Sequence, residues 1–133
     1  MAGETDLKKM LSGLTPTLNS GEYIFICMKN IDKIQRSDTV MEFKEEEGVT
    51  IIMERQKADA LKLNYNGVFG WITLEIHSSL EAVGLTAKFS NALAQNNISC
   101  NVVAGFYHDH IFVPIQDSQK AVEVLCKLSE NES

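Results

Sequence analysis

Three histidines and one aspartate are the residues of this chain whose types and spacing could do chemistry. His108, Asp109 and His110 are consecutive, and His77 is the only other histidine. Because alternate residues of a strand share a face, His108 and His110 could ligate a metal ion together with His77. An Asp-centred turn, however, also closes hairpins through side-chain hydrogen bonds to the backbone. No histidine pair at helical spacing and no cysteine pair joins this group, so we favour a turn or ligand-lining role and expect no metal or cofactor.

The same group could also act as a general base in hydrolysis. A base made by His108 and Asp109 would need a nucleophile, which motifs such as Gly-x-Ser-x-Gly or an activated cysteine supply. The sequence contains no such motif. We therefore expect a protein without catalytic residues, not an enzyme.

A second chemical feature is the run Ser78-Ser79-Leu80-Glu81, which fits a helix capping box with Ser78 and Glu81 three residues apart. As a structural cap it would contribute about 1 kcal/mol. Alternatively, the oxygens of a bound ligand take over the amides that such a cap would satisfy. Both interpretations remain open.

Regular hydrophobic patterns predict the elements that position these residues. Residues 70–77 alternate apolar and polar side chains, which is typical of a strand with one buried face. Apolar residues at three- and four-residue spacing predict a helix over 84–95. Strand character returns over 98–104, and 110–113 forms a second strand that pairs with it through a hairpin at 106–109.

A strand, a helix and a strand followed by a hairpin form the split β-α-β core of a ferredoxin-like fold. We therefore predict an α+β protein with antiparallel sheets and with helices packed on one face. This topology brings His77, His108 and His110 to the end of the sheet at which helix 84–95 begins. That end is where a ligand is expected.

The first half of the chain repeats this plan in a reduced form, without most of the first helix. Gly48 supplies the positive φ that a tight hairpin needs. In the helix of this half, Ala60, Leu61 and Leu63 are expected to face inward. The expected strands and helix of this half cover 23–28, 40–44, 49–54 and 56–63.

The repeated plan predicts two fused α+β units, and a single seven-strand domain without internal symmetry is the alternative. A helix over 5–13 precedes them, with an apolar stripe that includes Leu7, Met10 and Leu11, and Pro16 ends it. The expected divisions are an N-terminal helix and linker over 1–20, a degenerate unit over 21–67 and a second unit over 68–130.

Composition and charge exclude several function classes. With 44% hydrophobic residues in 133, a packed core is expected. A net charge of −6 leaves no basic surface for nucleic acid or for an anionic membrane, and no apolar run approaches the length of a membrane span. Cys27, Cys100 and Cys126 lie in apolar patterns without metal-ligand spacing. We expect buried, inert thiols and a cytoplasmic protein.

Two large aromatic residues, Trp71 and Tyr107, carry a polar tip on an apolar ring. Packing in the core or in an interface is favoured for both over direct stacking on a ligand. Burial between the two halves or between two chains is therefore expected.

The run from Gly84 to Ser99, Gly-Leu-Thr-Ala-Lys-Phe-Ser-Asn-Ala-Leu-Ala-Gln-Asn-Asn-Ile-Ser, resembles the core of an ACT domain. The shared features are a glycine at the strand-to-helix turn, Leu-Ala near the helix end, and Asn-Ile-Ser before the second strand. The longer string from His77 to His110 is similar to a family of small bacterial ACT-like proteins without an assigned function. The resemblance covers about residues 6–128 and implies tandem ACT-like units.

In ACT pairs that bind amino acids, the turn before the first helix and the start of the second strand clasp the ligand at a unit–unit interface. The helix N-terminus offers free amides and a positive dipole end, which suit a carboxylate. His77, His108, Asp109 and His110 would line the pocket. Asn101 stands where lysine-sensing relatives carry an Asp, so a basic ligand would gain no ion pair from it. The resemblance implies these ligand-binding residues: Ser79, Ala82, Val83, Gly84, Leu85, Thr86, Ser99, Cys100 and Asn101.

The resemblance extends to the regulatory halves of aspartate kinases and to a cytosolic arginine sensor of animals, both of which bind free amino acids. It implies a non-catalytic module that binds an amino acid or a similar small metabolite at a unit or subunit interface, in a homodimer. The alternatives are a regulatory or adaptor subunit for a transporter or a metabolic enzyme, and a histidine-based metal protein.

Overall fold

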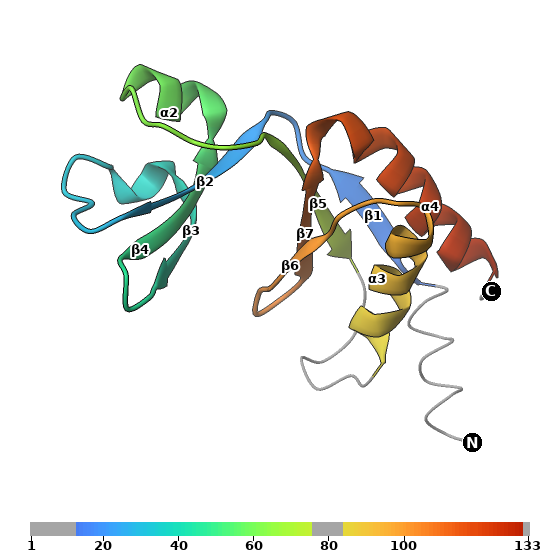
Figure 1. The fold of residues 1–133 in the computed structure, drawn as a ribbon. Helices are drawn as coiled ribbons and strands as arrows, with labels where there is room; N and C mark the ends of the chain where they lie inside the picture. The colour runs from blue at the N-terminus through green and yellow to red at the C-terminus, as the bar shows by residue number, and fades with distance from the viewer. Residues whose placement is uncertain (1–12, 76–83, 132–133) are drawn as a thin grey trace. The chain divides into compact units, whose positions relative to one another are not determined.

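The computed structural model describes residues 13–75 and 84–131 (Figure 1). Predictions for residues 1–12, 76–83 and 132–133, including most of the helix predicted over 5–13, lie outside the described residues. The contacts divide the chain into two units. Residues 20–69 are called the small unit, and the large unit joins the segment before residue 20 to the segment from Gly70 onward.

The small unit contains three antiparallel strands in the order β3-β4-β2. All three agree with the predicted strands. Phe69, the first residue of β5, pairs with Tyr23 on the other side of β2. The elements are β2 (Tyr23–Met28), a 3₁₀ turn (Arg36–Asp38), β3 (Thr39–Lys44), β4 (Val49–Glu54) and α2 (Arg55–Ala60).

The core of the small unit forms on one sheet face, to which alternate residues of β2 and β4 point. Its buried members are Ile24, Ile26, Ile34, Ile51, Met53 and Ala58.

The inward face predicted for the helix of the small unit is wrong for Ala60 and Leu61, which are exposed. Ala58 is the fully buried residue of this helix, and the half-buried Leu63 packs against the core as predicted. The reason is that α2 ends at Ala60, earlier than predicted. Lys62 then adopts a left-handed conformation with φ of 57°, which turns the chain out of the helix.

The large unit has four strands in the order β1-β5-β7-β6. Its predicted strand, helix, strand and hairpin strand are confirmed, although β6 begins at Asn101, three residues later than predicted. The elements are β1 (Thr15–Leu18), β5 (Phe69–Glu75), α3 (Leu85–Gln95), β6 (Asn101–Ala104), β7 (Asp109–Pro114), a 3₁₀ turn (Ile115–Asp117) and α4 (Ser118–Asn131).

Strand β1 was not predicted. It runs antiparallel to β5, with Thr15 opposite Glu75 and Leu18 opposite Ile72. A β-α-β-β-α-β unit needs a fourth strand, and here that strand precedes the small unit in the sequence. Pro16 fits because β1 lies at the edge of the sheet, where a missing N–H breaks no ladder.

Both long helices of the large unit cover the same face of its sheet, and Figure 1 shows α3 and α4 side by side. Ile72 and Leu74 of β5 are fully buried and belong to one cluster with residues of both helices. Phe89 of α3 and Leu125 of α4, both with 0% exposure, lie in this cluster. The predicted ferredoxin-like α+β fold, with antiparallel strands and helices on one face, is confirmed.

The prediction of buried thiols is wrong for two of the three cysteines. Cys27 and Cys126 are exposed and Cys100 is half-buried, and all three are free thiols. The reason is that each exposed cysteine lies on the face of its strand or helix that points away from the core. Ile24 and Ile26 of β2 face the core, so Cys27 faces away, and Cys126 follows the buried Leu125 onto the solvent side of α4.

Candidate functional site

Among the described residues, no side chain caps the first amides of helix α3. Its N-cap is Gly84, which has φ of 90° in the left-handed region, and the first turn contains no acidic residue. Leu85 and Phe89 anchor the helix to the core, and Lys88 N donates to Gly84 O over 3.0 Å as the helix starts. The N-terminal end therefore keeps a positive dipole end that no acidic side chain of its own first turn balances.

The first group of predicted site residues is the turn before α3. Gly84 caps the helix, Leu85 is buried with 3% exposure, and Thr86 is exposed beside them. Leu85 therefore supports the helix and offers a ligand only its backbone. The remaining turn residues, Ser79, Ala82 and Val83, lie outside the described residues.

The second group of predicted site residues lies at the start of β6. Ser99 and Asn101 are exposed and Cys100 is half-buried. Asn101 Nδ2 donates to the carbonyl of Phe112 over 3.2 Å, which orients the side-chain amide. Burial raises the pKa of the Cys100 thiol to about 11, so it stays protonated at neutral pH.

Within one unit, these two groups lie at opposite ends of α3. The helix has 11 residues, so its ends are about 16 Å apart. Gly84 precedes the helix, and Ser99 to Asn101 follow the turn at its other end. One ligand of amino-acid size cannot contact both groups of the same unit.

His108 and His110 share a face of the second hairpin, as predicted, with ring centroids 6.4 Å apart. His108 is exposed and His110 is half-buried. Burial lowers the pKa of His110, His108 lowers it further and Asp109 opposes the shift. His77 lies outside the described residues. The part of the chain that the structure describes holds no group of three or more metal-binding side chains.

His110 belongs to a polar network that the sequence did not reveal. Trp71 Nε1 lies 3.1 Å from His110 Nδ1, and Thr73 Oγ1 lies 3.2 Å from the same nitrogen. Because an indole N–H can only donate, Nδ1 accepts and carries no proton. Asn19 Nδ2 donates to Thr73 Oγ1 over 2.9 Å, so the network joins the end of β1, β5 and β7. A neutral His110 is required by this arrangement.

Comparison with known families decides the classification. Residues 2–70 match one ACT-domain family model, and residues 67–127 match a second ACT-domain model. The chain belongs to the ACT-domain family. Its two tandem matches agree with the tandem ACT-like units that the resemblance over about residues 6–128 implied.

Solved structures support this classification. A Vibrio cholerae protein of unknown function, described as a possible transport protein, has 39% identity and a TM-score of 0.86, and the match covers 96% of this chain and 98% of that one. An Agrobacterium tumefaciens protein has 16% identity and a TM-score of 0.67, over 87% and 89% of the two chains. A search of curated proteins finds no match.

The regulatory subunit of aspartate kinase from Thermus thermophilus shares the fold of this ACT protein. The two chains have 8% identity and a TM-score of 0.62, over 85% of this chain and 95% of that one. At this identity the likeness concerns the fold alone. Within the described residues, no helix is long and apolar enough to cross a membrane.

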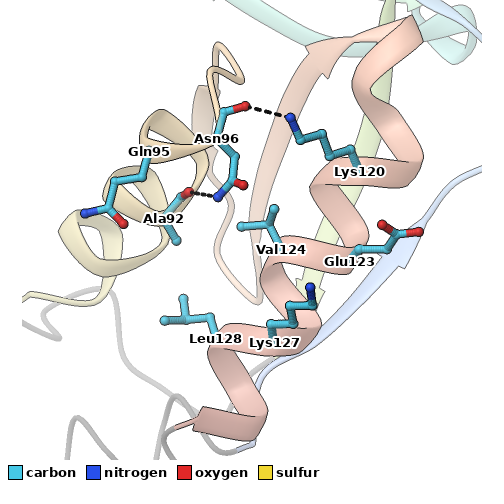
Figure 2. A pocket seen from close by; sticks show the side chains of 8 residues that line it. All are labelled: Ala92, Gln95, Asn96, Lys120, Glu123, Val124, Lys127 and Leu128. Carbon is cyan, nitrogen blue, oxygen red and sulfur yellow. Dashed lines mark hydrogen bonds between the residues drawn. The ribbon is translucent and has the colours of Figure 1, made fainter.

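The ACT protein also has a groove between α3 and α4 that sequence reasoning missed (Figure 2). Its volume is about 360 Å³. The available signal was the apolar stripe of α4, in which Val124 and Leu128 extend beyond the buried Ala121 and Leu125. The lining residues are Ala92, Gln95, Asn96, Lys120, Glu123, Val124, Lys127 and Leu128.

The two predicted aromatic anchors behave differently in this ACT protein. Trp71 is half-buried and stacks on Phe112 with ring centroids 6.0 Å apart, which agrees with a packing role. Tyr107 is 80% exposed at the β6–β7 hairpin, beside Phe106 with 82% exposure. The prediction of core packing is therefore wrong for Tyr107, because the hairpin turn projects both rings away from the sheet.

Proposed function

We propose that this chain is a non-catalytic regulatory module that binds a free amino acid, or a similar small metabolite with a carboxylate, at the N-terminus of α3. The observation that carries the proposal is the helix start: Gly84 has no side chain to cap the amides, and no acidic residue lies in the first turn. A carboxylate accepts hydrogen bonds from such amides and is favoured by the helix dipole. Membership of the ACT family, whose relatives include an aspartate kinase regulatory subunit, agrees with this role.

The distance between the two predicted groups favours a site shared by two copies. Strand β6 lies at the edge of the sheet of the large unit. If two β6 strands pair antiparallel, the start of one lies beside the end of the other. Asn101 of one copy then approaches the α3 N-terminus of its partner, which explains why two distant groups could hold one ligand. We therefore propose a homodimer with the ligand at the subunit interface.

Asn101 favours a particular class of ligand. Its Nδ2 is engaged by the Phe112 carbonyl, so its Oδ1 is the atom that would accept a hydrogen bond from the α-ammonium group of the ligand. The side chain carries no charge, so a basic ligand gains no ion pair. The proposed ligand is accordingly a neutral or acidic amino acid.

The chemistry of the site favours binding without catalysis. Cys100 is the cysteine nearest in sequence to the proposed contacts, and its pKa of about 11 keeps it in the poorly nucleophilic thiol form. Three free thiols also fit a reducing compartment, and we propose a cytoplasmic protein.

A thermal-shift screen of the twenty amino acids tests the proposal. A ligand at 100 times its Kd adds about 2.7 kcal/mol to the free energy of unfolding. In a chain of 133 residues the midpoint should rise by roughly 10 °C. No shift with any amino acid at millimolar concentration contradicts the proposal.

A matched pair of glycine variants localises the site. Gly84→Ala adds a methyl group at the helix cap, whereas Gly67→Ala places the same strain in a loop of the small unit, since both residues have positive φ. The methyl group at Gly67 would meet only Phe69, at an ordinary 3.5 Å. Gly84→Ala should abolish the ligand-induced shift and Gly67→Ala should retain it. Equal loss in both variants would show that the site lies elsewhere.

A second function, an adaptor for a transporter or a metabolic enzyme, is favoured by one observation. Phe106 and Tyr107 form an exposed aromatic pair with ring centroids 5.1 Å apart, and exposed aromatic residues often anchor protein interfaces. A relative described as a possible transport protein agrees with this candidate. Loss of a partner on Phe106→Ser/Tyr107→Ser, with the amino-acid shift unchanged, would support it. Binding of the same partner by this variant would contradict it.

A further inference from the structure

The groove between α3 and α4 has an apolar floor. Ala92 of α3 and Val124 and Leu128 of α4 form this floor, and each is half-buried. Figure 2 shows their side chains lying between the two helices. An apolar group that covers these partly exposed side chains removes their surface from water, which is favourable. The volume of about 360 Å³ lies near the lower end of the range for small-molecule sites, so it fits a small organic molecule better than another helix.

The rim of the groove carries two lysines of α4, Lys120 and Lys127, together with Glu123. Lys120 Nζ donates to the carbonyl of Asn96 over 3.1 Å, which balances the negative end of the α3 dipole. Figure 2 shows the Glu123 carboxylate on the side of α4 that points away from α3. Within the part of the chain that the structure describes, Lys127 forms no ion pair. Its charge is therefore available to a ligand.

A third lysine lies on the same side of α3 as the floor. Lys88 precedes Ala92 by four residues, about one helical turn, and is exposed. Three lysines against the one carboxylate of the described lining give this surface a positive potential, although the net charge of the chain is −6. An anion is attracted to such a surface, whereas the ammonium group of an amino acid is repelled.

We propose that the groove binds a small aliphatic carboxylate without an amino group, such as octanoate. The hydrocarbon chain would lie on Ala92, Val124 and Leu128, and the carboxylate would pair with Lys127 at the rim. This site is separate from the amino-acid site proposed above, because Ala92 lies about 12 Å along α3 from Gly84. Its ligand also differs, since an amino acid brings a positive charge and little apolar surface.

Titration of the full chain with octanoate, followed by the NMR shifts of its amides, tests the proposal. Octanoate should shift amides of residues 92–96 and 120–128 until they saturate. Hexanoate should bind about tenfold more weakly, because it buries two fewer methylene groups. Octylammonium has the same chain and the opposite charge, and it should leave these amides unshifted. Equal binding of the two ions, shifts that never saturate, or shifts confined to residues 84–88 would overturn the proposal.

A matched pair of alanine variants localises the site. Ala92→Glu places a carboxylate on the floor and should weaken octanoate binding at least tenfold, or about 1.4 kcal/mol. Ala94→Glu makes the same change at an exposed position on the other side of α3 and should keep the original affinity. An equal effect of the two variants contradicts the assignment.

A second pair decides the question if Ala92→Glu unfolds the chain. Lys127→Gln should weaken octanoate binding roughly threefold, because the ion pair is lost. Lys33→Gln removes an exposed lysine of the small unit and should have no effect. Unchanged affinity in Lys127→Gln would overturn the proposal.

Discussion

The two units differ in the segment that connects β5 to β6 in the large unit and β2 to β3 in the small unit. In the large unit, the 11-residue helix α3 stands between β5 and β6. In the small unit, a loop and a three-residue 3₁₀ turn stand between β2 and β3. A three-residue turn presents no helix N-terminus with free amides and no macrodipole of useful size. The comparison teaches that the proposed carboxylate site occurs once in each chain, in the large unit.

The same difference appears in the hydrophobic cores. The main cluster of the large unit contains eleven buried residues and that of the small unit contains six, so the large unit has more apolar surface to stabilise it. Ile34 replaces the missing crossover helix, because it is the buried residue of the β2–β3 loop. Ile34, with the partly buried Ile31 of the same loop, therefore covers in one unit the sheet face that Leu85, Phe89 and Leu93 cover in the other.

The largest expected effect comes from truncating the crossover helix. Phe89→Ala should lower the free energy of unfolding by about 3–5 kcal/mol, because removing this fully buried ring leaves a cavity in the core. Ile34→Ala, at the corresponding place in the small unit, should cost roughly 2 kcal/mol. Urea denaturation followed by Trp71 fluorescence measures the loss in the large unit, and circular dichroism measures both. A larger loss of unfolding free energy in Ile34→Ala than in Phe89→Ala would contradict the proposed difference between the two crossover segments.

The next effect compares the glycines of the two hairpins. A methyl group on Gly48 would meet the Met28 carbonyl oxygen at 2.9 Å, and one on Gly105 would meet the His108 carbonyl oxygen at 2.9 Å. Gly48 also has a positive φ of 156°. Gly48→Ala should therefore destabilise the protein by about 1–3 kcal/mol and Gly105→Ala by less. Thermal unfolding of the two variants checks the order, and the reverse order would contradict this account of hairpin strain.

A smaller effect concerns the pH dependence of stability. Every histidine lies outside the small unit, so any contribution from histidine comes from the large unit. The pKa of His110 is lowered in the folded chain, chiefly by burial, so the unfolded chain takes up a proton first as pH falls. Stability contributed by neutral His110 is complete above its ordinary pKa of about 6.5 and declines as pH falls through the lowered folded pKa. The raised pKa of Asp109, due mainly to burial, adds a change only at lower pH.

Unfolding curves recorded by Trp71 fluorescence between pH 7.5 and 5.5 measure this decline. His110→Asn offers Trp71 Nε1 an uncharged acceptor that does not titrate, and it should flatten the dependence in this range. His108→Asn is the matched control and should keep most of the decline, since His108 is exposed and outside the Trp71 bond. An unchanged slope in His110→Asn would show that the Trp71–His110 pair does not sense pH.

The smallest effect concerns thiol reactivity. Exposed Cys27 in the small unit and exposed Cys126 in the large unit should react with a disulfide reagent at pH 8 within minutes. Cys100, with its raised pKa of about 11, should react about a hundredfold more slowly. Mass spectrometry of the labelled peptides distinguishes the three thiols. Fast labelling of Cys100 would show that the start of β6 opens readily.

Much of the fold could be predicted from sequence because local patterns determined it. The apolar run of β2, the alternation in β5 and the stripe of α3 predicted both units and the ferredoxin-like class. Strand β1 was not predicted because Thr-Pro-Thr-Leu has almost no periodic pattern. Its pairing with β5 depends on residues more than fifty positions away. The exposure of Cys27 was not predicted for a related reason, because the sequence of an all-apolar strand does not indicate which face is covered.

The candidate site was less predictable. The Gly84 motif correctly located a helix start, because a glycine at a left-handed position leaves a clear signal. The Trp71–His110–Thr73 network did not show, since its members come from strands that are distant in sequence. The α3–α4 groove did not show either, because an apolar stripe that exceeds what the core covers looks the same in sequence as one that is fully buried.

Isothermal titration with the amino acid that gives the largest thermal shift tests the central claim most directly. We predict one ligand per chain, binding lost in Gly84→Ala, and binding retained in Gly67→Ala. Two ligands per chain, or binding that persists in Gly84→Ala, would contradict the claim that the start of α3, and nothing equivalent in the small unit, holds the ligand.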